Sequence, residues 1–385
     1  MERDRFTSDT FGRVLKTPGK FGYDAFIPTH LPRALELDAA TVATLSEADR
    51  AIGRLAGAGR LLPNPQVLVN AYVTREAVAS SRIEGTQATI SDVFQAATEG
   101  EPRGDVREVT NYIKAMALGL ARLADLPLSK RLVEEIHAQL LDDVRGAERS
   151  PGEIRRSQNW IGSPDNRPET AVFVPPPAEE MKEGLSDWER FLHEDLTMPP
   201  LVRCALMHYQ FETLHPFLDG NGRLGRLLII FFLIEGGHLP EPLLYVSSYF
   251  EEHKNEYYDR LQAVRERGEI QEWLRFFLTG ISIQAQDAVV RAEALTDLRE
   301  NYRQRLHGNR SRAHEIIDLV LVNPFVSTAG VAARLGITNA GATNLLRRLE
   351  SLGMLTPIAR LPGRSNRWVA SEVYSAITGP QSIQG

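Results

Sequence analysis

The sequence has a single cysteine and no long hydrophobic run. Cys204 cannot form an internal disulfide, and the adjacent residues ALMHYQ have helical character, so we expect a buried spectator rather than a nucleophile. No stretch approaches the about 20 uncharged apolar residues that a membrane helix needs, and the opening residues, MERDRFTSDT, are too polar for a signal peptide. We therefore expect no membrane contact and a cytoplasmic protein.

The sequence also has little excess charge of either sign. Its 44 basic and 50 acidic residues leave a net charge of −6, which gives no general affinity for nucleic acid. The charge is uneven, however, because residues 309–385 hold eight arginines against four acids. That tail has a net charge of +4 and the remainder −10, so the tail is the only segment whose charge favours contact with DNA.

What the sequence has in quantity is apolar periodicity of the helical kind. At 385 residues, 43% of them hydrophobic, the chain is long enough for two or three domains. After an arm of about 40 residues without a clear period, apolar residues recur at spacings of three and four through most of residues 39–300. In residues 158–177, by contrast, the β-prone runs NWI and AVFV flank a turn region and predict a hairpin.

The C-terminal block, residues 309–376, looks like a separate unit. Its pattern predicts a helix over residues 327–335, a turn at Gly336, and a second helix over residues 339–352 that Gly353 stops. Two short strands are expected to follow. This order of elements is typical of a winged helix-turn-helix.

The two strands of this block are expected around Pro362-Gly363. Asn344, Arg347 and Arg348 lie on the second helix, which in such modules enters the major groove of DNA. Winged helices also serve as dimerisation or protein-docking units. The sequence therefore leaves contact with DNA and contact with protein both open.

Residues 220–225, GNGRLG, have the glycine spacing of a dinucleotide-binding fingerprint. That fingerprint needs a strand just before its first glycine, whereas VRCALMHYQFETL has helical spacing and ends in a His-Pro loop. No alternating strand and helix pattern exists elsewhere, and the one Gly-Lys pair, Gly19-Lys20, lacks the rest of a P-loop. The motif therefore indicates neither a dehydrogenase nor a P-loop nucleotidase.

A better interpretation is a helix, a tight loop, and a second, almost wholly apolar helix that begins near Asn221. The start of a helix is an anion site because its N–H groups are unpaired, and Gly220 and Gly222 let a phosphate approach the backbone. Arg223 and Arg226 are disfavoured at that end by roughly 0.3–1 kcal/mol each. We therefore expect a strongly negative partner there.

The surrounding residues complete a site for a nucleotide. Two arginines three positions apart share a helix face and can grip successive phosphates. Asp219 is an oxygen ligand suited to Mg²⁺, and His215, with an ordinary pKa near ~6.5, is a proton acceptor at neutral pH. A zinc site from His208 and His215 is a poor rival because their spacing is not a ligand spacing. Together these residues predict phosphoryl or nucleotidyl transfer.

Residues 215–226, HPFLDGNGRLGR, resemble the complete signature of the Fic (Fido) family, H-x-F-x-[DE]-G-N-G-R-x-x-R. The resemblance extends over roughly residues 40–290, with GEIRRSQNWIG and FVPPP similar to the family's flap. It implies a mainly helical Fic core at residues 126–300 with a β-hairpin flap, preceded by an arm and helical region at residues 1–125. The activity it implies is transfer of AMP from ATP to a Tyr, Ser or Thr hydroxyl of a protein, the enzyme itself included.

The resemblance also implies a role for each residue of the motif. His215 would deprotonate the target hydroxyl, and Asp219 would hold Mg²⁺ that bridges the α- and β-phosphates. Arg223 would support the phosphates and Arg226 would take the γ-phosphate. The remaining nucleotide-binding positions of the motif would be Gly220, Asn221, Gly222 and Gly225.

Two further parts of the site are expected outside the motif. Tyr257 and Tyr258 are candidate neighbours of the adenine, although paired aromatic residues more often belong to a core. The hairpin at residues 159–174 would hold the target segment by strand addition, which orients a hydroxyl without reading much sequence.

Glu84, far upstream of the motif, is a candidate regulatory residue. Glu84 stands directly before Gly85, which looks like a helix C-cap, so this acid meets the negative end of a helix dipole and needs a cation. Ser80 lies one turn earlier on the same face. Residues 80–85, SSRIEG, resemble the Fic family's inhibitory motif, [ST]-x-x-x-E-[GN]. The resemblance implies an inhibitory helix at about residues 72–85 whose Glu84 pairs with Arg226 and blocks the productive pose of the γ-phosphate.

The leading hypothesis is thus an autoinhibited protein adenylyltransferase that uses ATP and Mg²⁺. One alternative is removal of AMP by the same site, with Glu84 positioning water. Another is a DNA-binding regulator whose Fic body is a sensor. An exposed helical face in such a body also leaves a homodimer open.

Overall fold

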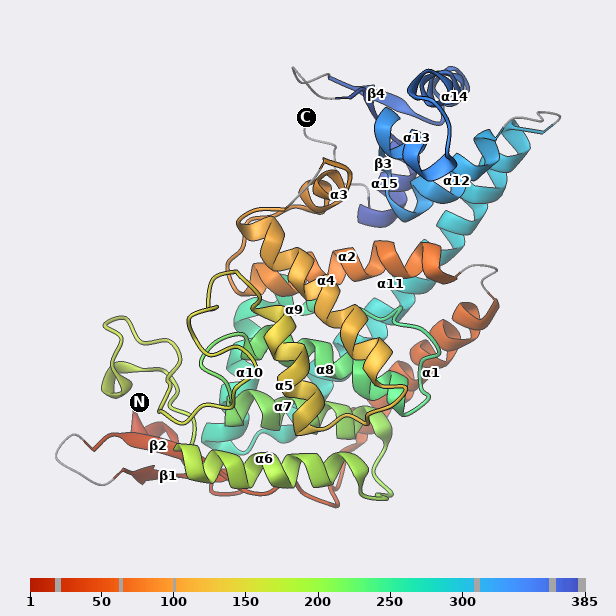
Figure 1. Cartoon of the computed structure of the whole chain (residues 1–385). Coiled ribbons are helices and arrows are strands. Elements are labelled where there is room, and N and C mark those ends of the chain that lie inside the picture. The colour runs from red at the N-terminus through yellow and green to blue at the C-terminus, as the bar shows by residue number, and fades with distance from the viewer. Residues whose placement is uncertain (18–21, 62–64, 100–101, 308–311, 360–364, 380–385) are drawn as a thin grey trace.

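The computed structural model describes residues 1–17, 22–61, 65–99, 102–307, 312–359 and 365–379. The fold is mainly helical, as the sequence predicts, and small sheets lie near the two ends of the described chain (Figure 1). No helix within these ranges is both long and apolar enough to span a bilayer. Up to residue 307 the helices are α1 (Ala39–Leu61), α2 (Pro65–Ile83), α3 (Ile90–Glu99), α4 (Asp105–Arg122), α5 (Lys130–Leu140), α6 (Ala178–His193), α7 (Pro200–Leu214), α8 (Asn221–Glu235), α9 (Ser247–Glu252), α10 (Lys254–Arg267) and α11 (Ile270–Arg305).

The core forms around α7 and α8, the two helices that flank the motif. Residues 223–233 of α8 are all buried, which is why this helix is apolar on every side. The buried indole N–H groups of Trp188 and Trp273 donate to carbonyls of α7, at Met207 and Ala205, and so fix α6 and α11 against it. Cys204, also in α7, is fully buried.

The N-terminal arm contains a hairpin that its sequence did not reveal. Strand β1 (Gly12–Lys16) pairs antiparallel with β2 (Asp24–Pro28), with Gly12 opposite Pro28. Strands of five residues offer too few alternations for a clear period. Phe26 of β2 packs against Phe173 of the flap, with ring centroids 6.0 Å apart, so the arm supports the flap.

The flap itself is less regular than the predicted hairpin. Within residues 158–177 the chain turns back on itself through a single antiparallel bridge, between Ile161 and Phe173, and a short 3-10 helix (Pro168–Thr170) forms at the tip. The Ile161 N–H donates to the Phe173 carbonyl at 2.8 Å, and the Phe173 N–H donates to the Ile161 carbonyl at 3.2 Å. The expected strands are therefore reduced to one bridged pair, because the turn region between them is too long for a regular ladder.

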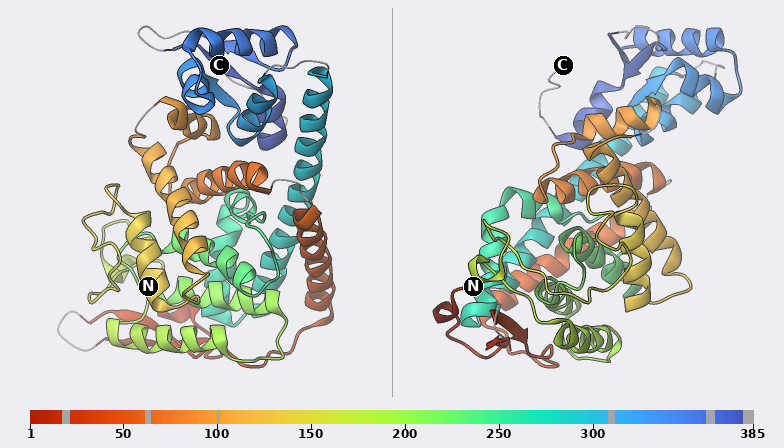
Figure 2. Two further views of the ribbon diagram at one scale, coloured as in Figure 1. Left: turned by 45° about the vertical axis from the view of Figure 1, so that its right-hand side comes forward. Right: turned by 60° about the vertical axis from the view of Figure 1, so that its left-hand side comes forward.

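Helix α2 lies between the core and the C-terminal unit (Figure 1). One side of α2 packs on α4, α8 and α9, and the other meets α12 and α15 of the C-terminal unit. The long helix α11 runs from the core up to that unit (Figure 2). The C-terminal elements are α12 (Ala313–Val322), β3 (Phe325–Ser327), α13 (Thr328–Leu335), α14 (Asn339–Ser351), β4 (Thr356–Ile358), β5 (Arg367–Val369) and α15 (Ser371–Thr378).

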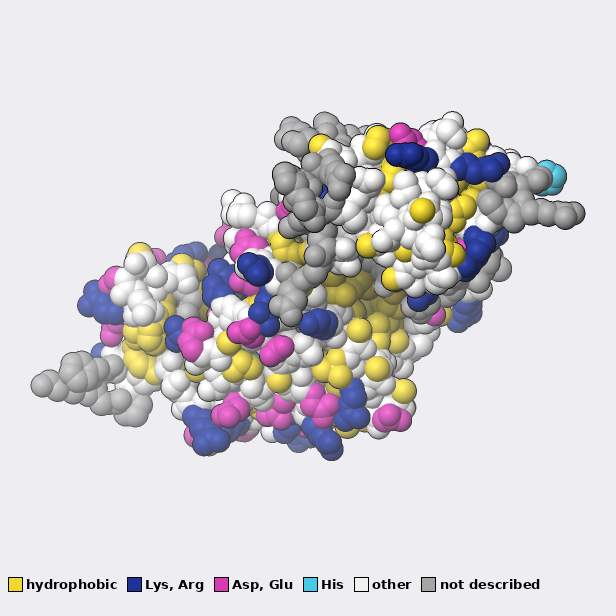
Figure 3. Space-filling view, turned by 45° about the horizontal axis from the view of Figure 1, so that its top comes forward, with side chains coloured by type: hydrophobic (Ala, Val, Ile, Leu, Met, Phe, Trp, Pro, Cys, Tyr) yellow, Lys and Arg dark blue, Asp and Glu magenta, His cyan; other side chains and the backbone are white. Residues whose placement is uncertain are grey.

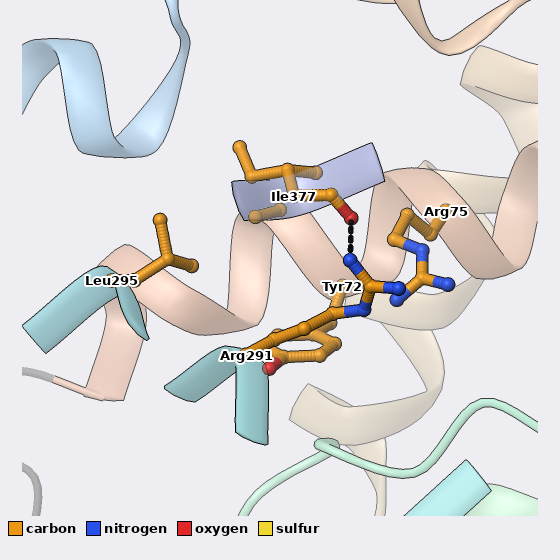
Figure 4. A pocket seen from close by; sticks show the side chains of 6 residues that line it. Tyr72, Arg75, Arg291, Leu295 and Ile377 are labelled. Carbon is orange, nitrogen blue, oxygen red and sulfur yellow. Dashed lines mark hydrogen bonds between the residues drawn. The ribbon is translucent and has the colours of Figure 1, made fainter. Parts of the chain in front are cut away.

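The contact between α2, α11 and α15 is polar and well connected. The Arg291 guanidinium of α11 donates to the carbonyl of Ile377 at 3.2 Å (Figure 4) and to that of Ala376 at 3.1 Å, which satisfies the last turn of α15. Asp287, one turn earlier on α11, accepts from Arg291 and from Arg75 of α2. The same central turn of α11 thus holds both α15 and α2.

The C-terminal unit contains a helix-turn-helix next to a three-stranded antiparallel sheet in the order β3-β5-β4. Gly336, between α13 and α14, has φ 62°, and Gly353 after α14 has φ 70°, both in the left-handed region that favours glycine. The turn expected at Pro362-Gly363 lies outside the described residues. Strand β3 was not expected. Figure 3 shows that basic side chains on the upper face of this unit have few acidic ones among them.

Candidate active site

The loop between α7 and α8 is closed by one side chain. Asn221, the first residue of α8, accepts from the N–H of Phe217 at 2.9 Å and donates to the carbonyl of the same residue at 2.8 Å. Gly220, just before it, has φ 76°. The motif therefore needs asparagine for its side chain as well as for its backbone amide, which the sequence did not reveal.

His215 ends α7 in a left-handed conformation, with φ 48° and ψ 61°, and its side chain is partly exposed. Its Nδ1 lies 3.4 Å from the carbonyl of Glu212, which favours the tautomer with hydrogen on Nδ1 and leaves Nε2 as an acceptor. Burial, aided by the nearby cations Arg155 and Arg265, lowers the pKa of His215 to about 3. The imidazole is thus neutral at physiological pH, as a proton acceptor must be.

Arg226 is buried, and it donates hydrogen bonds to Ser80 of α2 and to Glu84, which follows the last residue of α2. Its Nε donates to the Ser80 hydroxyl at 2.9 Å, and one terminal nitrogen donates to the Ser80 carbonyl and to Glu84 Oε1, both at 2.8 Å. Burial alone would raise the pKa of Glu84, but the charge and hydrogen bond of Arg226 hold that pKa below its usual value. Glu84, at the C-terminal end of α2, and Arg226, near the N-terminal end of α8, are each disfavoured by their own helix dipole, and they pair with each other.

Gly222 is needed for this approach. A Cβ at that position would collide with Glu84 Oε1, so only glycine lets the acid reach the first turn of α8. Gly225 has a different environment, because a Cβ there would collide with Glu212 of α7. Gly225 therefore serves the close packing of α7 on α8 and does not face the start of the helix where a nucleotide is expected.

Arg223 is held by an acid that sequence reasoning missed. Its guanidinium lies 3.1 Å from Glu108 Oε2, on α4, and 3.6 Å from Asp219 Oδ1. The Nε of Arg223 has no hydrogen-bond partner within the described part of the chain. Arg145 lies 3.4 Å from both Glu108 and the Glu84 carbonyl, so it links the two acids. Nothing in the local sequence of α4 distinguishes Glu108 from a surface acid.

Asp219 lies at the mouth of the site with its side chain 39% exposed. Its Oδ1 accepts from the N–H of Gly220 at 2.6 Å, and Oδ2 has no hydrogen-bond partner among the residues that the structure describes. No cluster of three or more His, Cys, Asp or Glu side chains suited to a metal occurs in the described ranges. A single carboxylate fits Mg²⁺, which binds through one or two carboxylates plus phosphate oxygens, and does not fit a zinc site.

His137, from α5, fixes the peptide that follows Asp219. Its Nδ1 accepts from the N–H of Gly152 at 2.8 Å, so the ring hydrogen is on Nε2, which donates to the Asp219 carbonyl at 2.9 Å. The ring stacks on Phe217 at 3.8 Å. Burial lowers the pKa of His137 to about 4, so it stays neutral. Sequence reasoning did not identify this residue, because a lone histidine in an amphipathic helix carries no signal.

The two tyrosines expected near the adenine have different environments. Tyr257 is buried, and its hydroxyl lies 2.8 Å from Nε2 of His208, whose Nδ1 faces the Gly225 carbonyl. This pair is part of the core, and it leaves His208 no open ligand position for a metal. Tyr258 is 42% exposed, so it can still meet a ligand.

Comparisons with known proteins find two matching regions in this chain. Residues 42–121 match a family model described as Fic/DOC family N-terminal, and residues 127–233 match one described as Fic/DOC family. The chain is a Fic/DOC family protein. The second match includes all of the motif, and the first includes Ser80, Glu84 and Glu108.

The adenylyltransferases to which this Fic/DOC protein is similar are distant relatives. It is 33% identical over 144 residues to the protein adenylyltransferase Fic of Culex quinquefasciatus, covering 37% of this chain and 25% of that protein. With the protein of the same name from Drosophila yakuba it shares 28% identity over 202 residues, covering 50% and 37%. The chain thus matches only about a quarter to a third of the length of these relatives.

A solved structure supports the fold. The crystal structure of a Fic family protein from Desulfovibrio desulfuricans G20 superposes with a TM-score of 0.57 at 22% identity, covering 87% of this chain and 97% of that one. At this identity the likeness establishes the architecture and leaves the chemistry to be argued from the site.

Proposed function

We propose that this protein is an autoinhibited adenylyltransferase that moves AMP from ATP to a Tyr, Ser or Thr hydroxyl of a protein. The observation that carries the proposal is the arrangement around the start of α8. A neutral imidazole, a partly exposed carboxylate and two buried arginines lie around the start of α8, whose N–H groups can bind an anion.

The reaction would proceed by direct displacement at the α-phosphorus. The target hydroxyl gives its proton to Nε2 of His215 as its oxygen attacks, and the bond from the α-phosphorus to the bridging oxygen breaks. Pyrophosphate leaves with the electron pair, and AMP remains on the target as an ester. The amides of Asn221 and Gly222 would donate to the transferred group, and Arg223 would contact the phosphates. The Gly220 N–H, which was also expected to donate there, is instead engaged by Asp219 Oδ1.

Asp219 is the residue that would hold Mg²⁺. The metal would offset negative charge on the phosphates. His137 holds the backbone carbonyl of Asp219, and the N–H of Gly220 holds its Oδ1. Together these two bonds set the direction of the Asp219 carboxylate. Tyr258 would border the base of the nucleotide from its exposed position on α10.

Inhibition would arise because Arg226 is already occupied. The γ-phosphate must displace Glu84 to reach the guanidinium, since Glu84 Oε1 lies 2.8 Å from it. ATP that binds without this contact would be held in an unproductive pose. Release of Glu84 is therefore the expected step of activation.

The flap, residues 159–174, would hold the target. Val172, beside the Ile161–Phe173 bridge, is 56% exposed, so this part of the flap is accessible to a target segment. Pairing through the backbone would place a hydroxyl near His215 with little dependence on sequence.

The test uses ATP labelled on the α-phosphate with a cell lysate. We expect Glu84→Gly to label protein, label on the γ-phosphate to give none, and the added change His215→Ala to abolish the signal. Asp125→Gly, an exposed acid just beyond the end of α4, is the matched control and should behave as the parent chain. Absence of α-label in the Glu84→Gly protein contradicts the proposal. Loss of label when a labelled target is returned to the parent protein would instead indicate AMP removal.

A second candidate function, DNA contact by the C-terminal unit, rests on α14. Asn344, Arg347 and Arg348 are exposed on this helix, and no ion pair of the two arginines appears in the part of the chain that the structure describes. A duplex that shifts in a salt-dependent manner would support this role.

A further inference from the structure

Arg155 is a buried cation with an unusual set of partners. Its side chain is 2% exposed, yet no carboxylate lies within ion-pair distance among the residues that the structure describes. Burial lowers the pKa of Arg155 to about 10, so it remains charged at neutral pH. A buried charge is costly unless it is hydrogen-bonded, so the partners of Arg155 show what it is for.

Four backbone carbonyls receive its donors. Two belong to the end of α7 and the residue after it, Leu214 at 3.2 Å and His215 at 2.9 Å. The other two stand at the two ends of the flap, Ser157 at 3.1 Å and Pro176 at 2.5 Å. One planar guanidinium therefore joins the backbone of His215 to both ends of the flap.

The conformation of His215 makes this contact necessary. A residue other than glycine in the left-handed region is disfavoured by roughly 1–2 kcal/mol. The His215 carbonyl accepts from Arg155 and, at 3.1 Å, from Asn159 of the flap, which also donates to Phe217. The positive charge also faces the carbonyl end of α7, where the helix dipole is negative.

We propose that Arg155 is a positioning residue that fixes His215 to the flap, so that the imidazole and a hydroxyl presented by the flap meet in one geometry. This inference rests on the proposed function, because it assigns the alignment of base and target in that reaction. It requires no contact between Arg155 and the nucleotide. Arg155 should therefore affect transfer much more than it affects nucleotide binding.

The first experiment separates these two effects in the Glu84→Gly background. Arg155→Met should lower the rate of label transfer about 100-fold, the effect of a misplacement of about 1 Å, while calorimetry gives a Mg·ATP affinity within about twofold. Arg155→Lys should rescue little, because one ammonium group cannot span four carbonyls. Arg156→Met, its exposed neighbour, is the matched control and should change neither quantity.

The pH profile provides a readout that a purely structural role would not move. The charged groups that face His215 are Arg155, Arg265 and Glu84. Removing the Arg155 charge should shift the acidic limb of the transfer rate to higher pH, because a cation that disfavours protonated His215 is lost. An unmoved limb in Arg155→Met counts against the proposal.

Hydrogen exchange tests the coupling without any activity. Arg155→Met should speed exchange in the flap and in residues 215–220 together, and Arg156→Met in neither. If Arg155→Met does not fold, Asn159→Ala should still lower transfer about five- to tenfold with Mg·ATP affinity kept. Equal loss of transfer and nucleotide binding, or exchange unchanged in both segments, would overturn the inference. If the Glu84→Gly protein is inactive but hydrogen exchange changes as expected, the proposed function is wrong and the coupling of His215 to the flap by Arg155 stands.

Discussion

Replacing Glu84 with Gln is the most direct perturbation of the proposed inhibition. The change keeps the shape of the side chain and turns the ion pair with Arg226 into a hydrogen bond from the guanidinium to an uncharged amide oxygen, so the attraction between opposite charges is lost. A hydrogen bond to a charged group is worth about 1.5–3 kcal/mol when buried. The Glu84 side chain is 30% exposed, so solvent screens the pair and the lower end of that range, about 1.5 kcal/mol, applies.

At about 1.4 kcal/mol per factor of ten, removing this interaction should increase the fraction of sites open to the γ-phosphate about tenfold. The apparent dissociation constant of Mg·ATP, measured by calorimetry, should fall by the same factor in Glu84→Gln and at least as much in Glu84→Gly. Adding Arg226→Met should cancel the gain, since the guanidinium is what Glu84 competes for. An affinity that is the same in the parent and Glu84→Gln proteins would refute this account of inhibition.

The inhibition should also be insensitive to pH near neutrality. Burial tends to raise the pKa of Glu84, but Arg226 holds it below the usual value. An acid whose folded pKa is lowered contributes fully above its ordinary pKa and loses its effect only as pH falls through the lowered value. The affinity ratio between the parent and Glu84→Gln proteins should therefore stay constant from about pH 6 to 8.

Three further predictions concern other contacts. Gly119→Ala, whose Cβ would collide with the Phe231 ring, should destabilise the fold by about 1–3 kcal/mol, and unchanged thermal unfolding would contradict the packing. His137→Phe removes the donor to the Asp219 carbonyl, so the Mg²⁺ concentration for half-maximal transfer should rise about 10- to 100-fold, as seen in a metal titration. If DNA binds α14, alanine at Arg347 and Arg348 should reduce the salt slope of binding by about two, and an unaltered slope would exclude the helix.

The sequence predicted the start of α8 at Asn221 because the signals for it are local. Residues 215–226 are contiguous, so the position of the helix start and the misplaced arginines follow from periodicity and dipole arguments alone. The pairing of Glu84 with Arg226 bridges 142 positions of the chain, and only a resemblance to a family could propose it. Local reasoning could say that each charge needed a partner but not which one.

The residues that support the motif could not be predicted from the sequence, because they too are far from it along the chain. Glu108 meets Arg223 across 115 positions, and His137 meets the Asp219 carbonyl across 82. Arg155 reaches His215 across 60 positions. Each of the three lies in an ordinary amphipathic helix or loop, where its type is compatible with a surface residue. Only the packing of α4 and α5 and the loop after α5 around the motif gives them a role.

The position of Glu84 would make the proposed inhibition reversible. Glu84 lies just beyond the last residue of α2, Ile83, whose carbonyl accepts from Lys254. Its side chain can leave Arg226 without unwinding the helix. Ser80, within α2, contacts the guanidinium Nε at 2.9 Å and can remain in place. A triphosphate therefore has to replace one partly exposed carboxylate, while the rest of the arginine's environment stays fixed and keeps the guanidinium aimed at the start of α8.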